Sequence, residues 1–300
     1  MDPAIRKRIE SNIFHAAHRA IEVWDEYPWH TREGGIDTWQ PNSSQALSID
    51  VFGTLKAFEN PLARDAVMNT LASELGMESD HGWEIKLEWK DDRNHLNEAR
   101  RTQVDVRAKG QKNLILMECK FTEQDGGSCS QVNPLHKGKH KGQRQCNGAY
   151  KRQINPVNER ESECALTAKG IRYWELIPEI FIFDRRQEHD ECPFNGGWFQ
   201  WMRNLVLCAE IAKTNNLQPK VLVVYVDSPL MPFRQKIDGG DWISFLNVLK
   251  KRTLLSTLSY RQVLELGIIA LEPHDTERDI WEDLRKHVQS KVTSVESGNW

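Results

Sequence analysis

The sequence lacks a long hydrophobic run. No apolar stretch in the 300 residues approaches the roughly 20 residues that a membrane-spanning helix needs. The basic first segment, residues 1–8, is not followed by the apolar stretch of a secretory signal. We therefore expect a cytoplasmic protein without a membrane partner. The sequence also has no internal repeat and no low-complexity linker, so we expect one folded domain over residues 1–300.

Two further shortages narrow the class of protein. There is no excess of positive charge, because 43 Asp and Glu residues outnumber 40 Lys and Arg residues. Any contact with nucleic acid would then depend on a local basic patch. None of the 6 cysteines forms a Cys-X-X-Cys pair, and without an export signal we expect reduced thiols or a metal site rather than disulfides. Four of them fall in or beside one irregular segment and could hold zinc or an iron–sulfur cluster: Cys129, Cys146, Cys164 and Cys192.

Three charged side chains lie on a predicted β-hairpin. Residues 103–108 and 114–121 are β-like runs on either side of a polar turn. Asp105 lies on the first run, and Glu118 and Lys120 lie on one face of the second, because strand side chains alternate. Their neighbours are apolar, so burying these charges is costly unless they pair or bind something. A divalent metal held by the carboxylates would explain all three charges, and a cross-strand salt bridge on a half-solvated sheet is the alternative.

This arrangement resembles the PD-(D/E)XK nuclease superfamily, which has the restriction-endonuclease-like fold. In that pattern an Asp precedes a Glu-X-Lys triplet across a hairpin. Here Asp105 precedes Glu118-Cys119-Lys120, and Val104 stands where a proline often precedes the Asp. The resemblance covers residues 43–125 most closely. It implies an α/β fold with a mixed central sheet flanked by helices.

The resemblance also implies a chemistry. It implies an endonuclease that hydrolyses DNA phosphodiester bonds with Mg²⁺, for which Mn²⁺ can substitute, in restriction or phage defence. Asp105 and Glu118 would supply carboxylate oxygens to the ion, and the backbone carbonyl of Cys119 would point at the same ion. Lys120 would position or deprotonate the water, or neutralise the transition state. Restriction enzymes of this fold often dimerise to cut both strands, and a homodimer is compatible with this sequence.

A further site residue is implied by the first core helix. The string Ser43-Ser-Gln-Ala-Leu resembles the first core helix of one bacterial branch of the superfamily, in which a polar residue faces the metal site. Gln45 is the candidate for that residue. The alternative is that Gln45 lies in a solvated first turn of the helix.

Periodicity predicts the elements around the hairpin. Apolar spacing predicts helices over residues 3–26, 43–58, 61–76, 198–214, 242–251, 260–266 and 276–291, and strands over 83–89 and 221–226. The core would then comprise about 43–125 and 198–270, with helical extensions at both ends. Residues 122–195 would form a large irregular insertion after the Glu-X-Lys strand, and a loop of this length needs a functional or ligand-based explanation.

The insertion carries a basic segment. Residues 136–144 contain no acid, and basic residues continue just beyond them. Such patches supply the sequence-independent part of nucleic-acid binding, and a mobile, solvated loop is the alternative. The candidate nucleic-acid-binding residues are Lys137, Lys139, Lys141, Arg144, Lys151 and Arg152.

Two other functions compete with the nuclease. One is a non-catalytic nucleic-acid-binding module of the same fold, against which the intact Asp, Glu and Lys argue. The other is an interaction protein built around a cysteine-bound metal, in which the Glu-X-Lys triplet is accidental.

Overall fold

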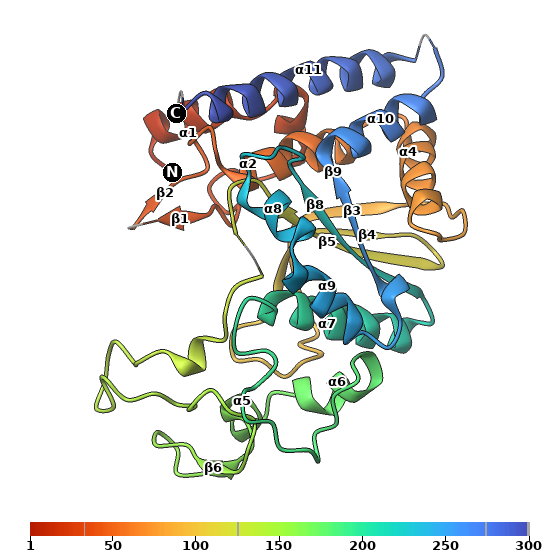
Figure 1. The fold of residues 1–300 in the computed structure, drawn as a ribbon. Coiled ribbons are helices and arrows are strands. Elements are labelled where there is room, and N and C mark those ends of the chain that lie inside the picture. Colours follow the sequence, from red (N-terminus) through yellow and green to blue (C-terminus); the bar gives the residue numbers. More distant parts are fainter. Residues whose placement is uncertain (33, 125, 274, 299–300) are drawn as a thin grey trace.

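The computed structural model describes residues 1–32, 34–124, 126–273 and 275–298. Five strands form the central sheet, with helices on both of its faces (Figure 1). Their spatial order is β3 (Glu84–Lys90), β4 (Gln103–Lys109), β5 (Asn113–Lys120), β8 (Gln218–Tyr225) and β9 (Leu255–Ser259). The first three strands are antiparallel neighbours, whereas β5, β8 and β9 run parallel. The mixed α/β sheet predicted from the sequence is confirmed.

The central strands are apolar because helices cover both of their faces. All residues of β5 are buried, as expected for a strand that pairs in parallel inside a sheet. A parallel partner cannot follow through a tight turn, so the chain must cross over before it enters β8. Helix α7 (Phe199–Asn215) provides the end of that crossover and packs against β8 and β5.

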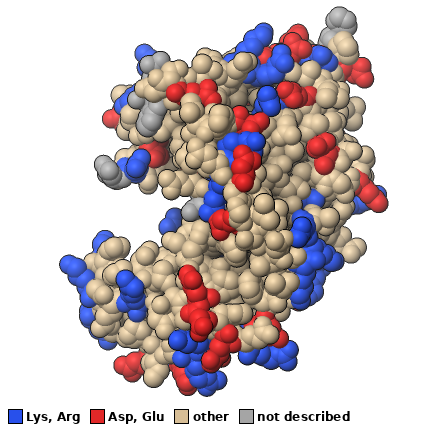
Figure 2. Space-filling view, viewed as in Figure 1, with Lys and Arg blue, Asp and Glu red and all other residues tan. Residues whose placement is uncertain are grey.

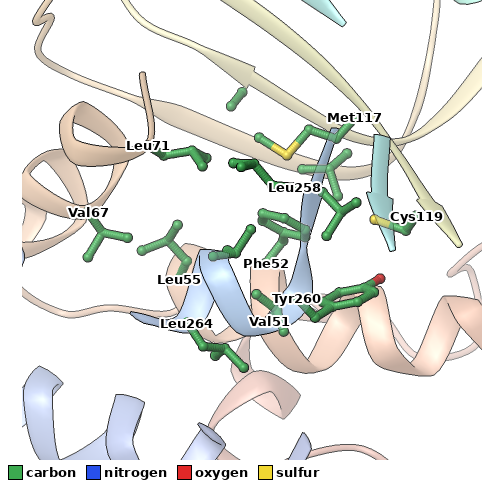
Figure 3. Packing of buried hydrophobic residues seen from close by; sticks show 14 of the residues in the cluster. Val51, Phe52, Leu55, Val67, Leu71, Met117, Cys119, Leu258, Tyr260 and Leu264 are labelled. Atoms are coloured by element: carbon green, nitrogen blue, oxygen red, sulfur yellow. The ribbon is translucent and has the colours of Figure 1, made fainter. Parts of the chain in front are cut away.

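One helical layer contains the first core helix. That helix runs without a break through α2 (Ser44–Ser48), the π-helical turn η2 (Ile49–Gly53) and α3 (Thr54–Lys56). Figure 3 shows Phe52 and Leu55 of this helix packed with Met117 and Leu258 of the sheet. The other helices of this layer are α4 (Pro61–Glu74), α10 (Tyr260–Ala270) and α11 (Thr276–Glu296).

The opposite layer is built around α7. Alternate residues of β8 divide between the two layers, since Leu222 and Val224 face the first layer whereas Val221 and Val223 face this one. The other helices here are α6 (Tyr173–Ile180), α8 (Pro232–Asp238) and α9 (Gly240–Asn247). Within the described residues, no helix is long and apolar enough to cross a membrane.

The N-terminal helix is shorter than predicted. Helix α1 (Pro3–Asn12) ends where Ile13 becomes extended, and the 3₁₀ turn η1 (His15–Ala20) follows it. Three tertiary hydrogen bonds turn the chain here. Asn12 donates to the carbonyls of Thr38 and Gln40, and the amide of Phe14 donates to the buried carboxylate of Asp50. The apolar spacing continues through this break, and therefore the sequence did not reveal it.

Residues 122–195 form a lobe of mostly irregular chain beside the sheet (Figure 1). Helix α6 attaches this lobe to α7. The other regular elements of the lobe are short: η3 (Ser130–Val132), β6 (Gln153–Ile154), β7 (Glu161–Ser162) and α5 (Ala165–Ala168). Elsewhere, β1 (Thr31–Arg32) and β2 (Gly35–Ile36) form a small ribbon ahead of α2, and the 3₁₀ turn η4 (Arg252–Leu254) leads into β9. The boundaries between core and insertion stay a prediction.

Candidate active site

Three carboxylates lie in a row across neighbouring strands. Glu88 of β3 lies between Leu87 and Trp89, whose partners on β4 flank Asp105. Asp105 of β4 and Glu118 of β5 come next after the last pair of these two strands, Val106 and Met117. Glu88 and Glu118 are buried, and Asp105 is half-buried. Like charges placed directly opposite one another in a sheet are destabilising. Burial, Glu118 and Glu88 together raise the pKa of Asp105 well above its ordinary value. The acid row therefore concentrates negative charge, which a bound cation would neutralise.

The hairpin opens where the acid row crosses it. The last paired residues of β4 and β5 are Val106 and Met117. Beyond them, Asp105 Oδ2 accepts a hydrogen bond from the backbone N–H of Cys119 at 2.6 Å, so the side chain replaces the missing backbone pairing. The Cys119 sulfur lies on the other face of the sheet, in the core near Tyr260 (Figure 3). Cys119 can therefore offer only its backbone to the acid row.

Lys120 belongs to a buried polar network around Glu118. Its Nζ lies 2.9 Å from Glu118 Oε1 and 3.0 Å from Gln200 Oε1. Gln200 Nε2 donates to Glu118 Oε1 at 2.6 Å, and Asn204 Nδ2 donates to Glu118 Oε2 at 3.0 Å. Burial opposes the charged ammonium, but Glu118 and the nearby carboxylates outweigh it and raise the pKa of Lys120 above its ordinary value. The structure thus brings Asp105, Glu118 and Lys120 together.

Sequence reasoning missed Gln200 and Asn204. Both lie on α7, four residues apart, so they share one helix face. The residues around them are largely buried and apolar. The sequence signal that could have found them is a pair of amide side chains four residues apart in this largely apolar helix. The long insertion between β5 and α7 hid their connection with the Glu-X-Lys strand, because no local pattern spans it.

Glu88 was also missed, and its backbone explains why. The alternation along β3 would place Glu88 on the exposed side with Glu84 and Lys86. Instead, Glu88 is 6% exposed and has a left-handed φ of 49°, at the position that the pairing of β3 with β4 skips. A residue other than glycine rarely adopts this conformation, and such strain gathers at functional sites. Gln103 also donates to Glu88 Oε2 from the neighbouring strand.

Gln45 supports Glu88 from the first core helix. Its Nε2 donates to Glu88 Oε1 at 2.8 Å and to the Pro28 carbonyl at 3.1 Å. Its Oε1 accepts from the His30 backbone N–H and the Thr38 hydroxyl. Gln45 is 2% exposed, so it does not lie in a solvated turn. The structure places it behind Glu88 rather than against Asp105 and Glu118.

His30 adds a nitrogen ligand at the end of the row. Its Nε2 lies 3.5 Å from Glu88 Oε2. One ligand atom each from His30, Glu88 and Asp105 lie within 4.8 Å of one another. Burial lowers the pKa of His30, but Glu88, Asp105 and Asp37 outweigh it and raise the pKa to about 9. The sequence around His30 does not distinguish this histidine from others, because its partners lie on β3 and β4.

The acid row borders a cavity of about 590 Å³. Its lining includes the segment 28–32 as well as Lys120 and Gln200. Lys90 and Arg100 add positive charge around the acids. Figure 2 shows a hollow on this view of the surface, between the part that carries β1 and β2 and the lobe of residues 122–195.

The basic segment lies exposed in the lobe. Leu135 and Gln143 form a backbone hydrogen bond at 3.0 Å across it, so the lysines stand on a short loop. Among the described residues, no carboxylate pairs with Lys137, Lys139, Lys141 or Arg144. Lys151 and Arg152 are exposed as well, and Arg152 lies 3.5 Å from Glu161. Lys and Arg also gather at the tip of this lobe in Figure 2.

The fold and the site together define a restriction-endonuclease-like protein, with charged side chains where the hairpin of a mixed sheet opens. A family model described as "Restriction Endonuclease associating with ARP" matches residues 1–227, and the chain belongs to this family. No curated protein and no solved structure matches the chain. The family indicates a nuclease-like function and a nucleic-acid partner. Assignment to a bacterial branch stays a prediction.

Proposed function

We propose that the protein is a metal-dependent endonuclease that hydrolyses DNA phosphodiester bonds. The observation that carries the proposal is the acid row beside a buried lysine. Glu88, Asp105 and Glu118 lie on three neighbouring strands and line one cavity, and Lys120 lies 2.9 Å from Glu118. A cross-strand salt bridge would need only one acid for one lysine. The excess of buried carboxylate is what a divalent cation would neutralise.

The donor chemistry of the row fits Mg²⁺ or Mn²⁺. Carboxylate oxygens are the ligands that these ions prefer, and an imidazole nitrogen suits Mn²⁺ better than Mg²⁺. Asp105 and Glu118 would hold the ion, with Glu88, His30 and the Cys119 backbone carbonyl as further donors. When bound, the ion would supply Lewis-acid stabilisation and an activated water for attack at phosphorus.

The protein's own residues would orient and stabilise the reacting phosphate. Lys120 presents its charge toward the row and is held in place by Glu118 and Gln200. Its role in this proposal is to neutralise negative charge that develops on the phosphoryl oxygens. Asn204 and Gln200 fix the Glu118 carboxylate by donating to its two oxygens. These fixed groups need no rearrangement during the reaction.

DNA would reach the cavity under guidance from the basic loop. The lysines of this loop are exposed and free of acidic partners among the described residues. Contacts of this kind bind the phosphate backbone without reading sequence. Restriction or phage defence is the biological setting that we propose for such an enzyme, and a homodimer is the arrangement that would let it cut both strands.

Cleavage assays on three variants test the proposal. Asp105→Ala, Glu118→Ala and Lys120→Ala are each expected to reduce Mg²⁺-dependent cleavage by at least about 10²-fold, with thermal unfolding showing that the variants are folded. Retained cleavage in all three would sink the proposal. DNA binding in EDTA without cleavage in Mg²⁺ or Mn²⁺ would favour the non-catalytic binding module instead. Cleavage of RNA alone would change the substrate class.

A further inference from the structure

Four cysteines that are distant in sequence meet in the lobe of residues 122–195. Cys129, Cys146, Cys164 and Cys192 all line one cavity of about 30 Å³. The rest of the wall is mainly apolar, and includes Leu166 of the lobe. All four are free thiols, whereas the remaining two cysteines, Cys119 and Cys208, lie buried in the core.

The backbone brings these cysteines together through hydrogen bonds between their loops. The Cys192 N–H donates to the Gly148 carbonyl at 2.8 Å, and the Cys129 N–H donates to the Asn195 carbonyl at 3.0 Å. Asn195 Nδ2 also donates to the Gly148 carbonyl at 3.0 Å. The three loops around Cys129, Cys146 and Cys192 are thus joined into one frame.

The sulfur of Cys146 accepts a backbone hydrogen bond within this cavity. The Gly148 N–H donates to the Cys146 sulfur. The Gly148 bond is 3.4 Å long. An N–H donor stabilises a sulfur that carries negative charge.

Burial raises the pKa of three of the four thiols, those of Cys129, Cys164 and Cys192. Burial raises the pKa of Cys192 to about 12, and the neighbouring Cys164, Cys129 and Cys146 raise it further. Burial likewise raises the pKa of Cys129 to about 11. A bound metal reverses this shift, because it binds the thiolate form.

We propose that Cys129, Cys146, Cys164 and Cys192 bind one metal centre through four thiolates. Four cysteine thiolates are the donor set both of a structural zinc ion and of an iron–sulfur cluster. Zinc at 2.3 Å from four sulfurs sets these atoms roughly 3.8 Å apart. Among the described residues, no three cysteine sulfurs lie within 4.8 Å of one another. A cluster spans a wider ring of thiolates than a single ion does.

The metal centre would fix in place the parts of the lobe that contribute to the active site. The basic segment 136–144 lies between Cys129 and Cys146, so both of its ends would be fixed. Phe199 and Met202 of α7 line the cysteine cavity, whereas Gln200 of the same helix contacts Lys120. Metal binding would thus brace the first turn of α7 and the basic loop together. This role in DNA cleavage rests on the proposed function, but the site itself does not.

Metal analysis of the full chain tests the site directly. The protein is purified without oxygen, and iron, acid-labile sulfide and zinc are measured per chain together with the visible absorption spectrum. We expect stoichiometric iron and sulfide with broad visible absorption. Stoichiometric zinc without sulfide would support the four-thiolate site and assign it to a zinc ion. No bound metal, even after reconstitution with iron and sulfide or with zinc, would overturn the proposal.

Matched variants separate this proposal from the nuclease. Cys146→Ser and Cys192→Ser are expected to lose the metal and its absorption, whereas Cys208→Ala, a buried cysteine outside the cavity, keeps both. Metal kept in both serine variants would contradict the site. Asp105→Asn should hold the full complement of metal while it fails to cut DNA. Metal-loaded wild type that cuts nothing would refute the nuclease and leave the cysteine site standing.

Discussion

Gln45 of the first core helix donates a hydrogen bond to Glu88 of β3 at 2.8 Å. This contact ties the helix to the strand at the residue whose backbone is left-handed. Strain of this kind persists only where the surroundings over-determine it. The four partners of Gln45, from three separate segments, provide that constraint. The hydrogen bonds of Gln45 thus hold Glu88 in the acid row, where the regular alternation of β3 alone would not.

Glu88→Gln is expected to lower DNA cleavage by about 10–100-fold, the usual cost of losing a group around a metal site. It should also raise the metal concentration needed for half-maximal activity, because the row loses one negative charge. Cleavage rates across a Mg²⁺ titration measure both effects. Glu84→Gln, on the same strand but half-exposed, serves as the control. Wild-type rates for Glu88→Gln at every Mg²⁺ concentration would remove Glu88 from the site.

Asp105→Asn should stabilise the metal-free protein while it abolishes cleavage. The change relieves repulsion from Glu118 and Glu88, worth up to about 1 kcal/mol, and an asparagine oxygen can still accept from the Cys119 N–H. Denaturant unfolding in EDTA measures the difference. Asp65→Asn is the contrast, because Asp65 accepts from the Gly82 and Trp83 N–H groups and faces no such row. A fall in the stability of Asp105→Asn would show that the row is not repulsive.

Gln200→Ala should act on the rate of the chemical step rather than on DNA affinity. Lys120 and Glu118 each lose a hydrogen-bond partner, while the exposed basic loop is untouched. We expect kcat to fall by about 10–100-fold with little change in KM. Gln289→Ala, at an exposed position on α11, is the matched control. An unchanged kcat would mean that the contact to Lys120 is incidental.

The basic loop should account for part of the salt dependence of DNA binding. Replacing Lys137, Lys139 and Lys141 together by alanine should reduce the slope of log affinity against log salt by about 2.7, if each lysine contacts one phosphate. Fluorescence anisotropy at several salt concentrations measures the slope. The exposed lysines Lys7, Lys112 and Lys251 form the control set. An equal loss in both triple variants would indicate non-specific charge rather than a defined binding loop.

A buried ion pair away from the site should govern acid stability. Asp50 is fully buried and pairs with Lys291 of α11. Burial raises its pKa, but Lys291 and His287 outweigh burial, so the pKa of Asp50 is lowered in the folded protein. A lowered folded pKa means that the stabilisation is present above the unfolded value, about 3.9, and is lost as pH falls through the folded pKa.

Asp50→Asn tests that assignment. The variant leaves Lys291 buried without its partner, and the expected cost at pH 7 is about 3–5 kcal/mol. Its stability should also fall less steeply than that of the wild type as pH is lowered from 5 to 3. Urea unfolding at each pH measures this. Asp283→Asn breaks an exposed pair with Lys286 and should change little. Equal acid sensitivity of wild type and Asp50→Asn would contradict the assignment.

Local patterns were enough to predict the hairpin and its charges. Asp105, Glu118 and Lys120 lie on two strands joined by a short turn, so their proximity follows from alternation and pairing alone. The buried strand over 221–226 and the helix before it followed from composition in the same way. Each of these features depends on residues that are close in sequence.

The rest of the site depends on contacts that no local pattern encodes. Gln200 reaches Lys120 only because the chain returns through α7 after a long insertion. Glu88 has a positive φ and is buried in the row, although alternation along β3 groups it with the exposed Glu84 and Lys86. The four cysteines have no short spacing, and only the folded lobe gathers them around one cavity. Strand β9 also escaped prediction, because its sequence, Leu255–Ser259, is short and largely polar.

Plasmid cleavage by wild type and Lys120→Ala, in Mg²⁺, in Mn²⁺ and in EDTA, tests the central claim most directly. Lys86→Ala, at an exposed position on β3, is the control for loss of one lysine. The account predicts nicking or linearisation of supercoiled DNA by wild type and Lys86→Ala in either metal, none in EDTA, and none by Lys120→Ala. Cleavage by Lys120→Ala at the wild-type rate, or no metal-dependent cleavage by the wild type, would contradict it.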